Sequence, residues 1–166
     1  MAHWLVKQEP TSYSWNRLVH DGLTRWDGVH NALALQHLRR MAVGDEAFFY
    51  HSGEERACVG LLRVASVPRP DPADSRGSWF VEVVPVRPLA RPVTLAEIRS
   101  DPVFEGIALL RNSRLSVMPI PEVAWERVLE RAASPPGSAP KVREGTRRRA
   151  RPRAPPRRGT GRSRRR

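Results

Sequence analysis

The sequence predicts an α+β domain in which five to six mostly antiparallel strands form a strongly curved sheet, closed into a small barrel with short helices at its rim. Two observations favour this fold class. Strand-like and helix-like patches alternate along residues 1–133. The long strands predicted at 47–52, 57–67 and 79–86 follow one another without intervening helices, which is typical of an antiparallel meander and not of parallel βαβ units.

The first part of the chain carries a predicted strand and a predicted helix before a turn, and a second predicted helix after it. The predicted elements are a strand at 3–7, a short helix capped by Ser12 or Ser14, a turn at 26–28 and a helix at 31–41. Trp4 heads the apolar run of the first strand, and Pro10 ends that strand because proline cannot donate to a β-ladder. Both helices are predicted from apolar residues at helical spacing.

The second half is predicted to contain the three long strands, a turn-rich loop at 68–77 and three shorter elements. The shorter elements are a helix at 94–101, a strand at 115–118 and a helix at 121–131. Thr94 followed by Glu97 three residues later is the pattern of a capping box. Pro121 is suited to a first helical turn, where its missing N–H costs nothing.

Residues 134–166 differ sharply in composition from the rest of the chain. They hold 13 of the 29 basic residues and one of the 17 acidic residues, so they carry the whole formal net charge of +12. All of the Phe, Trp and Tyr residues precede them. A segment with so few apolar residues cannot bury enough surface to offset its ordering entropy. We therefore expect one domain at 1–133 and a disordered Arg/Pro-rich basic tail at 134–166.

Several protein classes are excluded by composition. A single cysteine, Cys58, excludes an intramolecular disulfide framework and a Cys-rich zinc site, and the histidines show no metal-ligand spacing. No apolar run approaches the roughly 20 residues that span a bilayer, and the N-terminus does not read as a secretory signal. We expect a cytoplasmic protein, with nucleoid association as one option, and no membrane, metal or cofactor partner. The preference for Arg over Lys indicates a bacterial, GC-rich genome.

Four short segments in order carry a family resemblance. They are WLVKQEP at 4–10, WDGVHN at 26–31, MAVGD at 41–45 running into FFYHS at 48–52, and SRLSVMP at 113–119. Together they resemble the EVE domain family of the PUA-like superfamily, over about residues 2–131. The resemblance implies a pseudo-β-barrel with a pocket that accepts a single modified base of DNA or RNA. The family usually has Ser or Thr at the position of Gln8 and Arg at the position of His30.

A pocket for one isolated base needs flat aromatic faces and a few polar groups that meet the base edge. The residues that we expect to bind the modified base are Trp26, Gly28, Val29, Asn31, Tyr50, Ser52, Lys7 and Ser116. Trp26 and Tyr50 are expected to flank one hollow. Three of these candidates also have a structural interpretation: Trp26 can plug the end of the barrel, Asn31 can cap a helix, and Tyr50 can belong to the core.

Phosphate contacts are expected from arginines. Arg114, which shares a predicted strand face with Ser116, is one candidate, and Arg147, Arg148 and Arg149 of the basic tail are the others. Such a tail binds any polyanion through counterion release and carries no sequence information. Lys7 can meet a phosphate at the pocket mouth or form a surface ion pair with Glu9.

These observations favour a monomeric, non-catalytic reader of a modified base in nucleic acid. Two alternatives stay open. One is a small amidohydrolase that acts on modified cytidine nucleosides, for which Lys7 and Glu9 are candidate site residues, although no glycine-rich phosphate loop or nucleophile elbow is present. The other is a nucleoprotein-associated adaptor whose core binds protein.

Overall fold

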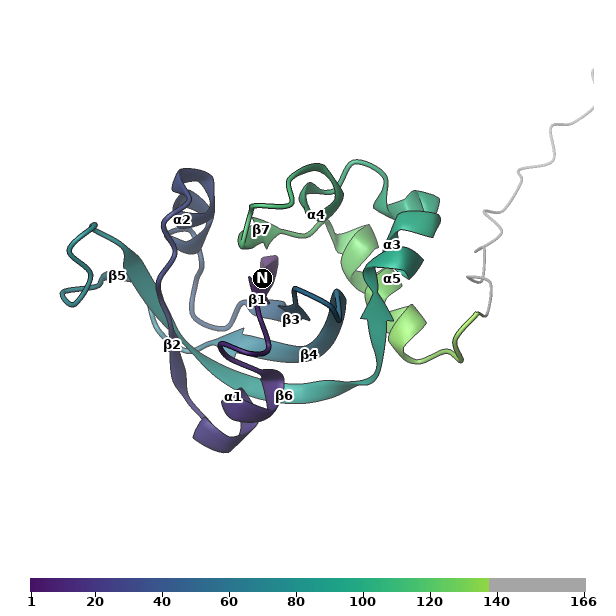
Figure 1. Ribbon diagram of the computed structural model, residues 1–166, viewed down its shortest axis with the longest axis horizontal. Helices are drawn as coiled ribbons and strands as arrows, with labels where there is room; N and C mark the ends of the chain where they lie inside the picture. Colours follow the sequence, from purple (N-terminus) through teal and green to yellow (C-terminus); the bar gives the residue numbers. More distant parts are fainter. Residues whose placement is uncertain (138–166) are drawn as a thin grey trace, which may run out of the picture.

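The computed structural model describes residues 1–137, which form a curved sheet with short helices around it (Figure 1). The strands are β1 (His3–Gln8), β2 (Thr24–Trp26), β3 (Glu46–His51), β4 (Ala57–Val64), β5 (Arg69–Pro70), β6 (Trp79–Thr94) and β7 (Val117–Pro119). The helices are α1 (Trp15–Asp21), α2 (Ala32–Leu38), α3 (Leu95–Ser100), α4 (Ala108–Arg111) and α5 (Glu122–Ala132), with one 3-10 turn, η1 (Pro102–Phe104).

The sheet runs in the order β2-β6-β4-β3-β1-β7, and β5 pairs with the start of β6. Only β1 and β3 are parallel to each other among the described strand pairs, and the remaining pairs are antiparallel. This confirms the predicted curved, mostly antiparallel sheet with short helices. The predicted closure is corrected: β2 and β7 are the two edges of the sheet, so the strands form a curled half-barrel.

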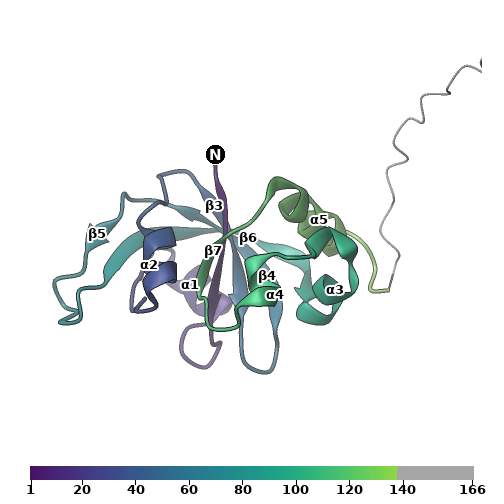
Figure 2. The ribbon, with the colours of Figure 1, turned by 90° about the horizontal axis from the view of Figure 1, so that it is seen from above.

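Side chains of β1 and β3 alternate between two faces of the sheet, and different helices cover each face. On one face the Trp4 ring lies 6.3 Å from the His37 ring of α2, between ring centres. On the other face the Phe48 ring stacks on Trp125 of α5, with centres 4.0 Å apart. Figures 1 and 2 agree that α2 and α5 lie on opposite sides of β1 and β7. We call these the α2 face and the α5 face.

The aromatic core is divided between these faces by the period-two alternation of β3. Phe49 lies on the α2 face, where its ring meets the rings of Trp15, Trp26 and His51 edge to face. Tyr50, the next residue, therefore lies on the α5 face with Phe48. The alternation of the predicted strand at 47–52 thus puts Phe48 and Tyr50 on one face and Phe49 and His51 on the other.

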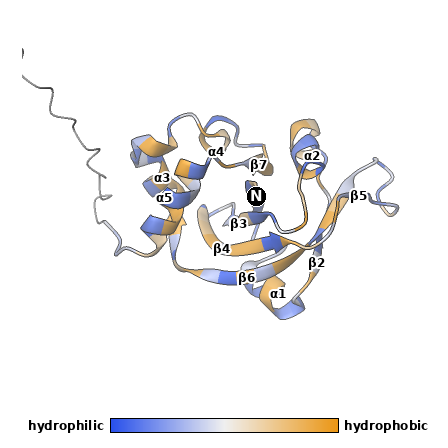
Figure 3. Cartoon of the chain, turned by 180° about the vertical axis from the view of Figure 1, so that it is seen from behind, coloured by the Kyte–Doolittle hydropathy of each residue, from blue (hydrophilic) through white to orange (hydrophobic). Residues whose placement is uncertain are grey.

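The sheet is bent where β4 pairs with β6. The register shifts between Cys58 and Gly60 and again between Leu61 and Leu62, and Pro88 of β6 lies opposite Gly60. Register shifts of this kind bend a strand, and proline removes a ladder hydrogen bond. The Trp15 ring of α1 occupies the space above Gly60 that a side chain would need, so α1 docks directly on the backbone of β4. Figure 3 shows β4 as a mostly hydrophobic strand, in agreement with the burial of most of its residues.

Several helix ends follow the sequence signals. Ser14 accepts a hydrogen bond from the Arg17 N–H at the start of α1, and Gly22, with a φ of 70°, ends that helix. The capping box of Thr94 and Glu97 is present at the start of α3. These predicted caps are confirmed because they depend only on local chemistry.

Other boundaries differ from prediction. Trp26 ends a strand instead of starting a turn, α2 is shorter than the predicted helix at 31–41, and β6 continues eight residues beyond the predicted strand end, from 86 to 94. The last strand begins at Val117, so Arg114 and Ser116 do not lie on a strand. The short elements η1 and α4 were not predicted, because three or four residues are too few to show a periodic pattern.

The domain's contacts continue past the predicted boundary at residue 133. The Arg91 Nε atom donates to the Ser134 carbonyl at 2.6 Å, and the Ser134 hydroxyl donates to the Glu130 carbonyl at 2.8 Å. Residues 138–166, which hold the predicted phosphate-binding Arg147, Arg148 and Arg149, lie outside the described part of the chain.

Candidate functional site

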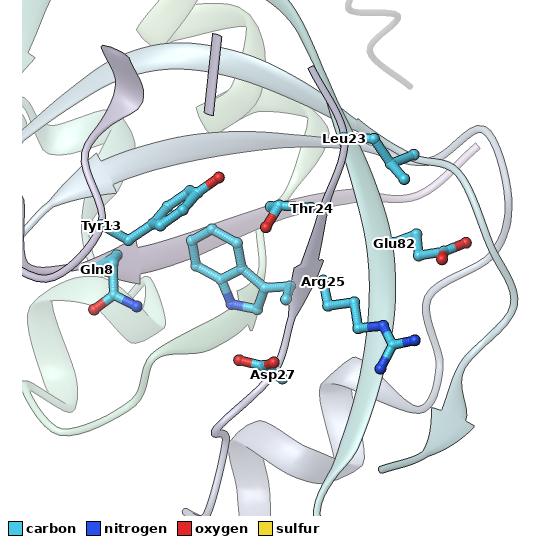
Figure 4. A pocket seen from close by; sticks show the side chains of 8 residues that line it. Gln8, Tyr13, Leu23, Thr24, Arg25, Asp27 and Glu82 are labelled. Carbon is cyan, nitrogen blue, oxygen red and sulfur yellow. The ribbon is translucent and has the colours of Figure 1, made fainter. Parts of the chain in front are cut away.

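A cavity of about 460 Å³ opens between the end of β1, the loop that leads to α1, and β2. Its lining comes from four segments: Gln8, Tyr13, Leu23, Thr24, Arg25, Trp26, Asp27 and Glu82. Figure 4 shows the side chains of Gln8, Tyr13, Thr24 and Asp27 on one side of β2 and those of Leu23, Arg25 and Glu82 on the other. We call the first four residues, together with Trp26, the Trp26 pocket.

Trp26 forms the rigid aromatic part of the Trp26 pocket. As the last residue of β2 it pairs with Val81 of β6, and only 5% of its surface is exposed. Its indole meets Phe49 at 90°, with ring centres 5.4 Å apart, so its position is fixed by the core. Trp26 therefore packs in the core and lines the cavity at the same time.

Tyr13 supplies the second ring of the Trp26 pocket. Its backbone N–H donates to the Glu9 carbonyl at 2.9 Å, and its hydroxyl donates to Asp21 Oδ2 at 2.8 Å. Burial raises the pKa of the phenol above its usual value, and the nearby Asp21 carboxylate raises it further. Tyr13 is thus a neutral, anchored ring that is only partly covered by protein.

Two polar side chains with opposite hydrogen-bonding character lie beside these rings. The Gln8 side-chain oxygen accepts the Glu9 backbone N–H at 3.0 Å, which leaves its NH₂ group as the free donor. Burial raises the pKa of the Asp27 carboxyl, and Asp71 and Asp74 nearby raise it further. Asp27 offers only acceptor oxygens when it is ionised.

A second hollow of about 400 Å³ adjoins the first at Asp27. It is lined by Asp27, Gly28, Asp71, Ala73, Asp74, Ser75 and Arg76. His30 contacts the Asp74 carboxylate through Nε2, and the Arg76 guanidinium donates to His30 Nδ1 at 2.9 Å. These contacts join the loop after β2 to the loop between β5 and β6. Gly28 has a φ of 67°, a conformation that glycine adopts without strain.

The predicted neighbours of Trp26 have structural contacts of their own. Val29 is buried, and its carbonyl accepts a hydrogen bond from the Ser78 hydroxyl at 3.0 Å. The Asn31 side-chain oxygen accepts the Ala34 N–H at 3.0 Å, so Asn31 caps α2 as its alternative interpretation expected. Neither residue lines the Trp26 pocket.

Tyr50 and Lys7 lie away from the Trp26 pocket, on the α5 face. Tyr50 is 2% exposed, and burial raises the pKa of its phenol to about 12. The Lys7 ammonium lies 5.8 Å from the centre of the Tyr50 ring and donates to the Ser113 carbonyl at 2.8 Å, and burial lowers its pKa. The expectation that Trp26 and Tyr50 flank one hollow is therefore corrected: adjacent residues of a strand face opposite ways, and Trp26 packs on Phe49, the residue before Tyr50.

The other predicted site residues are dispersed. The Ser52 N–H donates to the Gln8 carbonyl at 2.9 Å, which places Ser52 beside the end of β1. The Ser116 carbonyl accepts the Lys7 N–H at 2.8 Å, and Arg114 is exposed in the preceding turn. None of these three residues lines the Trp26 pocket.

Glu9, Cys58 and clusters of metal-ligating side chains are weak candidates for a catalytic or metal site. β1 ends at Gln8, so Glu9 does not extend the strand face that carries Lys7. Cys58 is fully buried, and burial raises the pKa of its thiol to about 12. Among residues 1–137, no three His, Cys, Asp or Glu side chains gather as metal ligands. No helix in the same residues is long and apolar enough to cross a membrane.

Sequence reasoning missed Gln8, Tyr13, Thr24 and Asp27 as pocket residues. Asp27 stands inside the motif that carried the family resemblance, and its place beside Trp26 could have suggested it. Tyr13 follows a turn of Glu9–Ser12 and shows no periodic pattern, so only the tertiary fold brings it to β2.

Comparison with known proteins gives a consistent result. Residues 2–131 match the EVE domain family. Thymocyte nuclear protein 1 from Homo sapiens is 30% identical over 163 residues, which cover 77% of this chain and 72% of that protein. The crystal structure of the human protein in complex with 5-methylcytosine containing DNA has a TM-score of 0.75 at 29% identity and covers 82% of this chain and 100% of that one.

Two further structures support the fold. Rpa0253 from Rhodopseudomonas palustris has a TM-score of 0.76 at 38% identity, covering 80% of this chain and 94% of that one. The YTH domain of the Zygosaccharomyces rouxii MRB1 protein, solved with N6-methyladenosine RNA, has a TM-score of 0.52 at 13% identity, covering 79% of this chain and 86% of that one, a likeness of fold alone. The match over residues 2–131 settles the family: the chain belongs to the EVE domain family.

Proposed function

We propose that this protein binds nucleic acid by taking a single modified base into the Trp26 pocket, and that it does so as a reader without catalysing a reaction. The observation that carries the proposal is a built cavity with two anchored aromatic rings, found on a fold whose human relative was crystallised with 5-methylcytosine containing DNA. The volume of about 460 Å³ lies within the roughly 300–1,000 Å³ of typical ligand pockets.

The pocket chemistry supports a base as the ligand. The rings of Trp26 and Tyr13 offer π-faces, and base–aromatic stacking contributes about 1–3 kcal/mol per base. Gln8, Thr24 and Asp27 add donors and acceptors beside the rings, as reading of a base edge requires. A ligand held only by phosphate would need cations in the cavity, yet its lining contains one arginine, Arg25, and two carboxylates.

Phosphate contacts belong to the surroundings of the pocket in this proposal. Arg25 is exposed on the far side of β2, with its guanidinium 4.5 Å from the centre of the Phe80 ring, which holds the charge in place. Arg114 and the tail residues Arg147, Arg148 and Arg149 remain proposed contacts to the nucleic-acid backbone. The tail would supply attraction through counterion release, and the domain would supply selectivity.

The proposal is tested with the full chain and short single-stranded DNAs that differ only in one central base, 5-methylcytosine or cytosine, with the matching RNAs as a second set. We expect tighter binding of the modified strand. Tyr13→Ala should weaken this binding about ten-fold by removing one stacking face, whereas Tyr13→Phe, which keeps the ring, should bind nearly as the wild type does.

Tyr50→Phe is the matched control, because it removes a phenol hydroxyl from the opposite face of the sheet. It should leave binding unchanged. Equal binding of modified and unmodified strands, in DNA and in RNA, would contradict the proposal. A larger effect of Tyr50→Phe than of Tyr13→Ala would indicate that the base binds on the α5 face.

The two alternative functions have their own tests. Incubating the protein with N4-acetylcytidine and following cytidine by chromatography tests the amidohydrolase, and product formation would contradict a pure reader. Calorimetry with a panel of modified nucleosides tests the adaptor, because heat from none of them would favour a core that binds protein.

A further inference from the structure

We propose that Asp27 makes the Trp26 pocket select a base with an exocyclic amino group, such as 5-methylcytosine, over a base with a keto oxygen at the same position, such as thymine. Asp27 accepts the amino group, and the Gln8 NH₂ donates to the ring acceptor beside it. This inference rests on the proposed function and adds the residues that distinguish the two base types.

The position of Asp27 is set by β2. It directly follows Trp26, and Figure 4 shows its carboxylate on the same side of the strand as Gln8, Tyr13 and Thr24. A base stacked in the Trp26 pocket therefore has an edge within the lining that Asp27 and Gln8 share. Because the indole is fixed by Phe49, the plane of a stacked base is fixed as well.

Among residues 1–137, no side chain donates a hydrogen bond to the Asp27 carboxylate, which is exposed and is reached by its own backbone N–H. Burial raises the pKa of its carboxyl, and the carboxylates of Asp71 and Asp74 raise it further, while its own backbone N–H and Arg25 act in the opposite direction. Asp27 and Asp71 both line the adjoining hollow, but Asp71 does not line the Trp26 pocket. A ligand N–H placed against Asp27 adds a donor to this carboxylate, and carboxylates accept from the amino group of cytosine in base recognition.

Gln8 completes the pattern. Its side-chain oxygen is engaged by the Glu9 N–H at 3.0 Å, so its NH₂ faces a ligand as a donor. Cytosine presents an amino donor next to a ring nitrogen acceptor, which matches Asp27 and Gln8 in turn. Thymine presents a keto acceptor next to a ring N–H. In the same orientation it places its keto oxygen against the Asp27 carboxylate and its ring N–H against the Gln8 NH₂ donor. Thymine and 5-methylcytosine carry the same methyl group, so a difference in affinity between them reports on the hydrogen-bonding edge of the base.

The experiment compares the full chain on two single-stranded DNAs that differ only in one central base, 5-methylcytosine or thymine, by fluorescence anisotropy. The wild type should bind the 5-methylcytosine strand about ten-fold more tightly. Asp27→Asn adds a donor to this position, and the preference should fall to about two-fold or less. Asp71→Asn is the matched control, since it removes a carboxylate near Asp27 that does not line the Trp26 pocket, and it should keep the preference.

Equal or tighter binding of the thymine strand by the wild type would overturn the inference, and so would equal losses of preference in Asp27→Asn and Asp71→Asn. These outcomes are distinct from failure of the proposed function. In that case neither strand would bind more tightly than one with unmodified cytosine, and Tyr13→Ala would change nothing. Melting temperatures of the two variants show whether each is folded before its preference is interpreted.

Discussion

Asp45 joins the N-terminal segment of the chain to the turn that precedes β3. Its carboxylate accepts the Trp4 indole N–H at 2.9 Å and the backbone N–H groups of Ala42 and Ala2 at 3.0 and 3.1 Å. Burial opposes ionisation of Asp45, but these hydrogen bonds outweigh that effect and lower the pKa of the carboxyl. The charged form is therefore the form that stabilises the fold.

We expect Asp45→Ala to lower the free energy of unfolding by about 3 kcal/mol at pH 7, because it leaves the buried Trp4 N–H without an acceptor. The pKa in the folded state lies below that in the unfolded state, so the contribution is fully present above about pH 4 and is lost as the pH falls through the folded-state pKa. Urea unfolding of the wild type and Asp45→Ala across this range measures it. A difference that does not shrink in acid would show that Asp45 acts without its charge.

Residues whose behaviour depends on local chemistry were predictable from sequence. Cys58, inside the predicted strand at 57–67, is 0% exposed, and His51, within the predicted strand at 47–52, accepts the Trp15 N–H at 3.0 Å. Trp26 was identified as a pocket residue, but its partner ring was not. Tyr50 and Tyr13 are both tyrosines near aromatic segments, and only the fold decides which one reaches Trp26.

The docking of α1 on the sheet depends on the absence of one side chain. A Cβ atom at Gly60 would lie 2.4 Å from Trp15 Cε3, and the Trp15 ring is itself enclosed and meets Phe49 edge to face at 5.9 Å between centres. The ring thus has no free space to move into. Gly60 is the point where the bend of β4 and the packing of α1 meet.

We expect Gly60→Ala to reduce the free energy of unfolding by about 1–3 kcal/mol through this overlap. Chemical denaturation measures the change. Combining Gly60→Ala with Trp15→Leu should recover part of the loss, because a smaller side chain at position 15 makes room for the new methyl group. Strictly additive costs in this double-mutant cycle would contradict a direct clash.

Among the elements, the long patterned segments were predicted, whereas the very short β2, β5, η1 and α4 were not. The strands at 46–51 and 57–64 and the helix at 122–132 have enough residues to show alternation or helical periodicity. β2 has three residues, and its place depends on pairing with β6 far along the chain. That missed strand explains most of the error at the site, since it supplies three consecutive residues of the cavity lining.

The formal net charge of the chain lies outside residues 1–137. Residues 138–166 contain 13 basic residues and one acidic residue, which leaves the described part of the chain with no formal net charge. The contacts of Ser134 with Arg91 and Glu130 show that a truncation should follow Gly137 and not Ala133. A cut at 137 removes the basic residues and keeps these hydrogen bonds.

We expect the chain that ends at Gly137 to lose most of the salt dependence of DNA binding. If the tail engages about six phosphates, the slope of log affinity against log salt should become less steep by about five. Binding of free 5-methyl-2′-deoxycytidine monophosphate, measured by calorimetry, should be unchanged. An unaltered slope would mean that the domain itself supplies the phosphate contacts, and loss of nucleotide binding would mean that the tail helps to form the pocket.

The edge position of β2 has a consequence for how occupancy of the cavity can be detected. This strand is three residues long and, among the strands of residues 1–137, pairs with β6 alone, and it carries Thr24, Arg25 and Trp26 of the cavity lining. A short edge strand opens at low free-energy cost, and a ligand that binds only the closed state raises that cost. Deuterium uptake at residues 24–26 should therefore slow when a base occupies the cavity, while the central strands β3 and β4 keep their rates, so that one short edge of the sheet reports on the state of the site.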